Sequence, residues 1–183
     1  MPSGESSGHA SRIGRAATTD VAELYTRYHD SLVRLLWRRT GDRDRAEDLA
    51  QEVFVRALET PPANPRPWLF AVALNLARDD GRRAARQGRK LELLSGEASG
   101  ASAPSPDLVF ESEEKVLAVR AALATLDEQD RSALLLKAEG FSYDDIAAAL
   151  GLAKGSIGTT LARARKRLVE AFRERGQVNH VAR

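Results

Sequence analysis

Hydrophobic residues recur at helical spacing in two stretches of the chain, and the first stretch, from about Thr19 to Arg86, predicts three helices. Asp20 suits the N-cap of the first helix, because Glu23 follows three residues later. A second helix is expected from about Arg43 to Leu58. The apolar positions of the first helix are Val21, Leu24, Tyr25, Tyr28, Leu32, Leu35 and Leu36. Those of the second are Ala46, Leu49, Ala50, Val53 and Ala57.

A proline-rich segment from Thr60 to Pro67 is predicted to be a loop, because proline fixes φ and lacks a backbone donor. Pro67 suits the first turn of a third helix. The apolar residues of that helix are Trp68, Leu69, Val72, Ala73 and Leu76.

The second stretch starts near Asp107 and predicts four more helices. Asp127 can cap the second of these, which should end at Gly140. The third, from Tyr143 to Leu150, has a capping box in Ser142 and Asp145, and Gly151 stops it. The fourth is expected from about Gly155 to Arg173.

Gly, Ser, Ala and Pro dominate residues 88–106, which is the composition of a flexible linker. We therefore expect an all-α protein of two small helical domains joined by that linker. The expected order is a disordered lead at 1–18, a domain at 19–87, the linker at 88–106, a helix-turn-helix domain at 107–175 and a tail at 176–183.

Composition narrows the function classes. The 183 residues suffice for two small domains, and the absence of cysteine excludes disulfides and thiolate chemistry. His9, His29 and His180 lack the spacing of zinc ligands. There is no apolar run of about 20 residues and no signal peptide, so we expect a cytoplasmic protein. Nothing in the sequence indicates catalysis, a metal or a cofactor.

Residues 141–157 have the pattern of a helix-turn-helix: a short capped helix, a glycine turn and a second helix. The alternative is an ordinary helical hairpin with a solvated basic face. DNA binding is favoured because eight cations and only two acids follow from Lys154 onward. The shared apolar interior is Ile146, Ala147, Leu150, Leu152, Ile157 and Leu161.

Two further motifs lie in the first stretch. On the second helix, Asp48, Gln51 and Glu52 share a face that is either a solvated surface or a dock for a basic partner. On the third helix, Trp68 is more often a core residue, whereas Asn75 suits either a buried hydrogen bond or a base contact. The arginine run that follows is either a solvated helix end or a nucleic-acid backbone site, and it comprises Arg82, Arg83, Arg86, Arg89 and Lys90.

Taken in order, five motifs resemble the extracytoplasmic-function (ECF) sigma factors of bacterial RNA polymerase, over about residues 21–172. The motifs are Tyr25-x-x-Tyr28, the segment 46–54, Trp68-Leu69, the segment 75–79 and the basic segment 163–168. This resemblance implies a non-catalytic subunit that binds core RNA polymerase and promoter DNA, and it admits an anti-sigma factor as a further partner.

The resemblance also implies site residues. Asp48, Gln51 and Glu52 match the polymerase-binding face. The residues that match the region binding and opening the minus-10 element are Asn64, Arg66, Asn75, Arg82, Arg83 and Arg86. Those that match the minus-35 helix and its backbone contacts are Lys154, Ser156, Thr159, Arg163, Arg165 and Arg167.

One departure from the family concerns Gly158 and Thr160, which stand where family members commonly carry basic residues. We therefore expect the minus-35 domain to bind phosphates more than to read bases. Two alternatives stay open. One is a free-standing helix-turn-helix regulator, and the other is a polymerase-binding adaptor with weakened promoter reading.

Overall fold

The computed structural model describes residues 20–95 and 110–181, and their side chains at 20–89 and 116–174. The expected N-terminal lead, most of the linker and the end of the tail lie outside the described residues. Within them every regular element is helical, which confirms the all-α prediction. The elements are α1 (Val21–Thr40), α2 (Arg43–Glu59), α3 (Pro65–Ser95), α4 (Phe110–Thr125), α5 (Glu128–Ala138), α6 (Tyr143–Leu150), the 3-10 turn η1 (Lys154–Ser156) and α7 (Ile157–Val181).

The predicted helix caps are confirmed. The carboxylates of Asp20 and Asp127 accept hydrogen bonds from backbone N–H groups in the first turns of α1 and α5. Ser142 accepts from the N–H of Asp145 at 3.1 Å and so starts α6. Gly151, at φ 65°, ends α6 with its N–H bonded to the Ala147 carbonyl. Local chemistry at these positions therefore sets the helix boundaries.

The boundaries of three helices differ from the prediction. The third helix starts at Pro65, not Pro67, and continues through Gly88 to Ser95, so the first residues of the predicted linker are helical. Arg, Gln, Lys, Leu and Glu flank Gly88, and their helix propensity offsets the cost of about 1 kcal/mol for one glycine. In the second unit α4 starts at Phe110, and the last helix runs from Ile157 to Val181.

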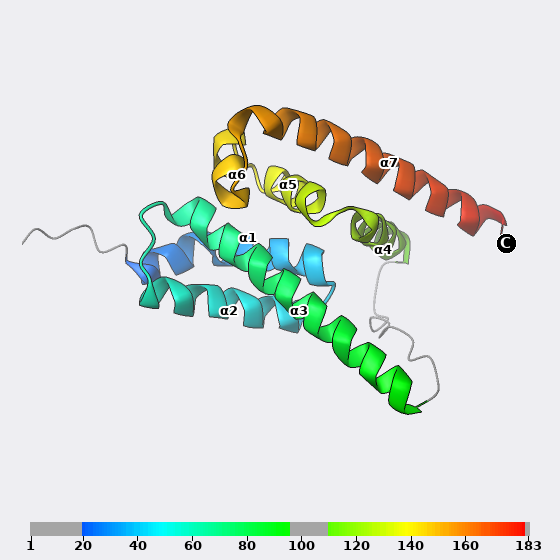
Figure 1. Ribbon diagram of the computed structural model, residues 1–183, viewed down its shortest axis with the longest axis horizontal. Helices are drawn as coiled ribbons and strands as arrows, with labels where there is room; N and C mark the ends of the chain where they lie inside the picture. The colour runs from blue at the N-terminus through cyan, green and yellow to red at the C-terminus, as the bar shows by residue number, and fades with distance from the viewer. Residues whose placement is uncertain (1–19, 96–109, 182–183) are drawn as a thin grey trace, which may run out of the picture.

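The first structural unit packs α1, α2 and α3 around one apolar core (Figure 1). Leu32, Leu35 and Leu36 of α1 are completely buried, as is Val53 of α2. Trp68 is half-buried and packs against this core, as the sequence favoured. No helix in the described part of the chain is long and apolar enough to cross a membrane.

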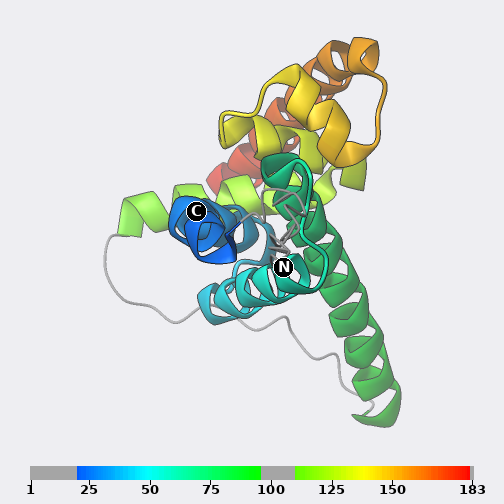
Figure 2. The same ribbon diagram turned by 90° about the vertical axis from the view of Figure 1, so that its left-hand side faces the viewer.

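The second unit packs α4 to α7 beside the first (Figures 1 and 2). Leu136, Ile146, Ile157 and Leu161 form its interior. Ile146 and Ile157 come from the two helices of the predicted helix-turn-helix, so these helices share an apolar core as expected.

The two units pack on each other instead of standing apart. Where α3 meets α6, the rings of Phe70 and Phe141 lie 4.7 Å apart between centroids, and both side chains are buried. Glu139, after α5, pairs with Arg38 and lies 3.5 Å from Arg34, both on α1. Aromatic packing and ion pairs thus join the units.

The continuation of α3 through Gly88 generates a prediction. A Cβ at Gly88 would meet no atom within 4 Å, so Gly88→Ala should stabilise the local helix by about 1 kcal/mol and raise the helical circular-dichroism signal. Gly151→Ala, at a left-handed φ, should instead lower thermal stability. If Gly88→Ala raised neither the helical signal nor the temperature at which this signal is lost, helix at this position would be contradicted.

Candidate nucleic-acid interface

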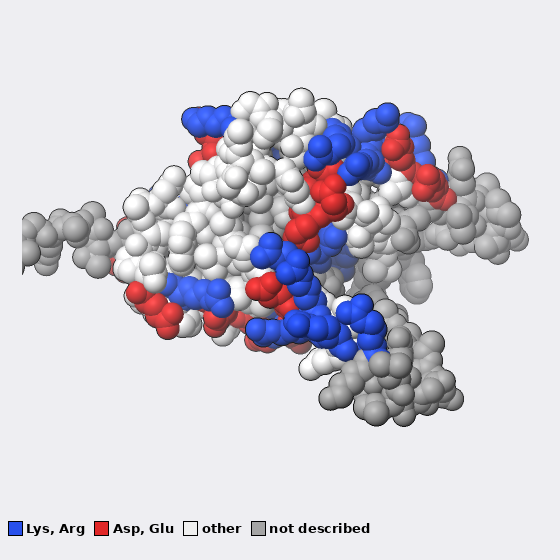
Figure 3. All heavy atoms as spheres, in the orientation of Figure 1, with Lys and Arg blue, Asp and Glu red and all other residues white. Residues whose placement is uncertain are grey.

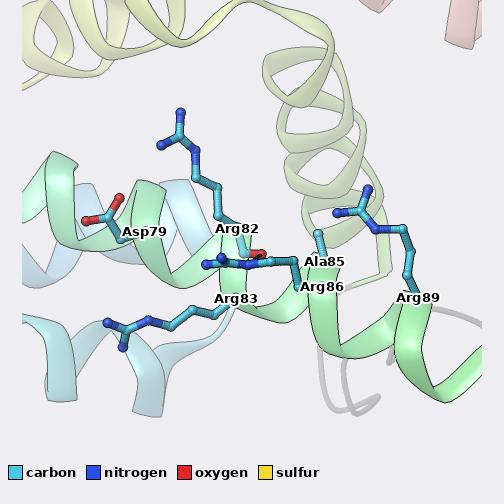
Figure 4. Close-up of a pocket in the computed structure, with 6 residues that line it drawn as sticks. All are labelled: Asp79, Arg82, Arg83, Ala85, Arg86 and Arg89. Atoms are coloured by element: carbon cyan, nitrogen blue, oxygen red, sulfur yellow. Dashed lines mark hydrogen bonds between the residues drawn. The ribbon is translucent and has the colours of Figure 1, made fainter.

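An exposed row of arginines occupies the second half of α3. Arg82, Arg83, Arg86 and Arg89 recur at helical spacing, and with Asp79 they line a hollow of about 520 Å³. Figure 4 shows their side chains fanning out from the helix, and Figure 3 shows positive charge gathered along this limb. The structure brings together three of the residues predicted for the minus-10 element.

These arginines differ from their neighbours in having no carboxylate partner. Within the described residues, none of Arg82, Arg83 and Arg86 forms an ion pair, whereas Arg45 of α2 pairs with Asp80. Arg86 Nε donates to the Arg82 carbonyl at 3.2 Å, which leaves the charge of this exposed guanidinium and its terminal nitrogens for phosphate oxygens. The row is therefore chemically suited to a nucleic-acid backbone.

Asn75 lies about two turns before Arg82 on α3 and is exposed, which removes the alternative of a buried hydrogen bond. It lines a cleft of about 580 Å³ between α3 and the second unit, together with Arg78 of α3 and Gln129 of α5. The amide can thus reach a ligand within a recess.

Asn64 and Arg66 do not join the arginine row. Asn64 is exposed at the start of α3, and its carbonyl accepts from Trp68. The guanidinium of Arg66 lies 4.2 Å from the ring of Phe141 and donates to the Glu139 carbonyl at 3.2 Å. Arg66 is therefore engaged by the second unit.

The residues predicted for the minus-35 element separate into two groups. Lys154, Thr159 and Arg165 are exposed, and Ser156 is half-buried. Lys154 pairs with Asp144 of α6 at 2.9 Å. The hydroxyls of Ser156 and Thr159 donate to the backbone carbonyls one turn before them. Arg165 has no ion pair within the described residues, so it is the most available cation of this group.

Arg163 and Arg167 are instead tied to a buried carboxylate. Asp130 of α5 is fully buried, and Arg163 Nε donates to both its oxygens at 3.0 and 3.1 Å. Arg167 donates to Asp130 at 3.1 Å and to Asp127 at 2.7 Å. These ion pairs connect α5 to α7, and we call the four residues that form them the clasp. Sequence reasoning missed Asp130, whose signal is an acid one turn into an apolar helix.

The clasp changes the pKa values of its members. A hydrogen bond from the backbone N–H of Asp130, together with Arg167, lowers the pKa of Asp127 below its usual value. The hydrogen bonds and charge of Asp130 raise the pKa of Arg163. Since the folded pKa of Asp127 is depressed, its contribution to stability is present above its unfolded pKa and is lost as the pH falls through the folded pKa.

The sequence places both Gly158 and Thr160 where base edges are read, and for Thr160 this placement is wrong. Thr160 is 3% exposed and faces the interior, so this position cannot reach a base edge. Gly158 is half-buried, and a Cβ there would lie 3.8 Å from the Tyr143 ring. Thr160 therefore gives no reason to expect weak sequence reading, whereas the expectation for Gly158 stays a prediction.

The acidic face of α2 is exposed as predicted. Asp48, Gln51 and Glu52 all face solvent. Val55 and Leu58, which sequence reasoning missed, continue the same face and are 48% and 65% exposed. The sequence feature that could have identified them is their helical spacing, which places both apolar residues on the same face as the acids. An acidic helix face with exposed apolar side chains is typical of a protein-docking surface.

The clasp predicts different roles for Arg163 and Arg165 in stability. Arg163→Gln should lower the urea midpoint of unfolding, because Asp130 stays buried with only part of its charge compensated. Arg165→Gln removes the same charge from an exposed side chain and should change stability by no more than about 0.5 kcal/mol. Equal midpoints for the two variants would refute the structural role of Arg163.

Comparison with known proteins identifies the two units. Residues 24–87 match the family model for sigma-70 region 2, and residues 117–168 match the model for sigma-70 region 4. The ECF RNA polymerase sigma factor EcfG of Rhodopseudomonas palustris is 40% identical over 139 residues, which span 70% of this chain and 72% of that protein. SigL of Mycobacterium tuberculosis, also an ECF sigma factor, is 33% identical over 82% of this chain and 89% of its own length.

Solved structures agree with this assignment. The sigma factor RpoE of Bartonella quintana, in complex with the anti-sigma factor NepR, superposes with a TM-score of 0.57 at 27% identity, over 84% of this chain and 97% of that chain. CnrH, in complex with the cytosolic domain of CnrY, gives a TM-score of 0.59 at 25% identity, over 82% and 85%. The chain belongs to the ECF sigma factors of the sigma-70 family.

Proposed function

We propose that the protein directs core RNA polymerase to promoters and opens the DNA at the minus-10 element, acting only as a subunit of that enzyme. The observation that carries this proposal is the unpaired arginine row on the α3 helix of region 2. This row occurs in one chain with a region 4 helix-turn-helix. The polymerase performs the chemistry, and the sigma factor itself is not an enzyme.

The proposed polymerase dock is the α2 face formed by Asp48, Gln51, Glu52, Val55 and Leu58. Its carboxylates complement a basic partner and would set the orientation in which the two proteins meet. The two exposed apolar side chains supply apolar surface that the interface would bury. Glu52 lies 3.0 Å from Arg56 in a solvent-exposed pair, which costs little to exchange for an intermolecular pair.

The proposed minus-10 contacts are divided between Asn75 and the arginine row. Unstacking a base costs a few kcal/mol, which hydrogen bonds in a recess and phosphate contacts can offset. Asn75 lies in such a recess, and Arg82, Arg83 and Arg86 follow on the same helix. Asn64 is already exposed, whereas Arg66 becomes available to DNA only if region 4 moves away from it.

For the minus-35 element we propose contacts by Lys154, Ser156, Thr159 and Arg165. These residues lie at the exposed N-terminal part of α7 and in the turn before it. Arg163 and Arg167 contribute chiefly by holding α7 on α5, and their remaining donors can face phosphates.

The two alternative functions receive less support. A free-standing regulator does not need region 2, and the adaptor rested on Gly158 and Thr160, of which Thr160 is buried. A protein that works on core polymerase belongs in the cytoplasm. The structural relatives are complexes with anti-sigma or cytosolic partners, so we include an anti-sigma factor among the proposed partners.

The polymerase dock is tested by charge reversal. Asp48→Lys with Glu52→Lys should weaken binding to core polymerase by a few kcal/mol, because like charges would face each other at the interface. Fluorescence anisotropy of labelled protein measures the affinity. Reversal of Glu23 and Asp30 on α1 is the matched control and should have little effect. Equal affinities for the two double variants would disprove the assignment.

The arginine row is tested by the salt dependence of DNA binding. With holoenzyme and single-stranded minus-10 DNA, Arg83→Gln should reduce the slope of log K against log salt by about 0.7, the value for one phosphate contact. Arg27→Gln on α1 removes an exposed charge outside the row and should leave the slope unchanged. A parental slope for Arg83→Gln would exclude it from the DNA contacts.

A further inference from the structure

A second cavity lies where the two units meet, away from the arginine row. Its volume is about 320 Å³, and it is enclosed by the C-terminal end of α1, by α4 and by α5. Four of its lining residues are arginines, and none is Asp or Glu within the described residues. The arginines are Arg38, Arg39, Arg120 and Arg131.

Only some of the N–H groups of Arg120 and Arg131 form hydrogen bonds with the protein. Arg120 stacks on Trp37 of α1 at 4.1 Å and donates through Nη1 to the Gly41 carbonyl at 3.4 Å. Arg131 donates through Nη2 to the Leu126 carbonyl at 3.1 Å. These contacts fix the position of both side chains, but other N–H groups of the same guanidinium groups form no hydrogen bond in the described part of the chain.

The donors left over are buried and have no hydrogen-bond partner in the described part of the chain. They are Nε of Arg39, Nε and Nη2 of Arg120, and Nε of Arg131. Buried unpaired donors are rare in folded proteins, because each costs about 1–3 kcal/mol. All four nitrogens belong to arginines that line the cavity, and an anion reaches them only if these side chains shift toward it.

The positive charge of the cavity is only partly compensated within the described residues. Arg39 pairs with Glu128 at 2.7 Å and Arg38 with Glu139, but the described residues offer no carboxylate to Arg120 or Arg131. Burial lowers the pKa of Arg39 and of Arg120, and the nearby charge of Arg131 lowers that of Arg39 further. An arginine cannot relieve this cost by losing its proton.

We propose that this cavity binds a small anion carrying a phosphate group. Planar guanidinium forks match phosphate oxygens, and several of them around one site provide both donors and charge. Water would satisfy the donors but leave the positive charges unbalanced. The volume lies at the lower end of small-ligand pockets, which fits inorganic phosphate, pyrophosphate or a small phosphorylated metabolite.

The site spans both units, since Arg38 and Arg39 belong to α1 whereas Arg120 and Arg131 belong to α4 and α5. An anion held by all four is lost when the units separate. Binding therefore stabilises the arrangement in which region 2 and region 4 are packed together. This inference rests on the cavity and does not depend on the promoter contacts proposed above.

Trp37 provides a local probe, because Arg120 lies over its ring. In the full chain with Trp68→Phe, Trp37 is the remaining tryptophan. Titration with pyrophosphate and, separately, with inorganic phosphate should shift Trp37 emission in a saturable way. Calorimetry should give one anion per chain. Phosphate bound to the α3 arginines would not produce this signal.

Two cavity variants and one control decide the proposal. Arg120→Gln and Arg131→Gln should each weaken anion binding at least tenfold, and Arg131→Gln leaves the contact with Trp37 in place. Arg43→Gln, exposed at the start of α2, should bind like the parent. Circular dichroism without anion checks that each variant is folded.

Three results would overturn the proposal. The first is the absence of saturable binding of either phosphate probe, and the second is equal affinity in Arg131→Gln and Arg43→Gln. The third concerns the source of the phosphate: if only a short single-stranded oligonucleotide shifts Trp37 emission in an Arg131-dependent manner, the site is a nucleic-acid contact and not a small-anion site.

Discussion

The contact between Phe70 of α3 and Phe141, just before α6, determines how the two sigma regions are presented. The rings meet at 4.7 Å in an edge-on geometry, and Arg66 covers the second ring. Arg66 cannot stack on Phe141 and grip promoter DNA at the same time. The packed arrangement therefore engages Arg66, one of the residues proposed for minus-10 contact, while the α3 row and the α2 face stay exposed.

Features encoded by neighbouring residues could be predicted from the sequence. The caps at Asp20, Asp127 and Ser142 depend on hydrogen bonds within three residues, so spacing alone identifies them. The end of α3 could not be placed, because glycine-rich composition and helical neighbours compete at Gly88. The packing of the two units could not be predicted either, because no short-range sequence pattern relates Phe70 to Phe141.

In the candidate site too, the features set by local spacing could be predicted, and those set by long-range packing could not. Helical spacing correctly put the α2 acids and the α3 arginines on exposed faces. It could not separate Arg163 from Arg165, because both are cations on one basic helix. The difference arises from Asp130, which lies 33 residues before Arg163 and is brought beneath it only by the fold. The burial of Thr160 likewise follows from the rotation of α7 on the core and not from residue type.

Pairing, more than net charge, determines what each arginine does. The chain carries 28 Lys and Arg against 26 Asp and Glu, so its net charge of +2 says little. Arg163 is held by a buried carboxylate and joins two helices of the second unit, whereas Arg83 meets no carboxylate among the described residues and keeps its charge for solvent or a ligand. Arg120 is intermediate, with part of its guanidinium bonded and part unsatisfied inside a cavity. A basic residue becomes a candidate for ligand binding when the fold leaves its charge unbalanced, and this condition is met along α3 and at the junction of the two units.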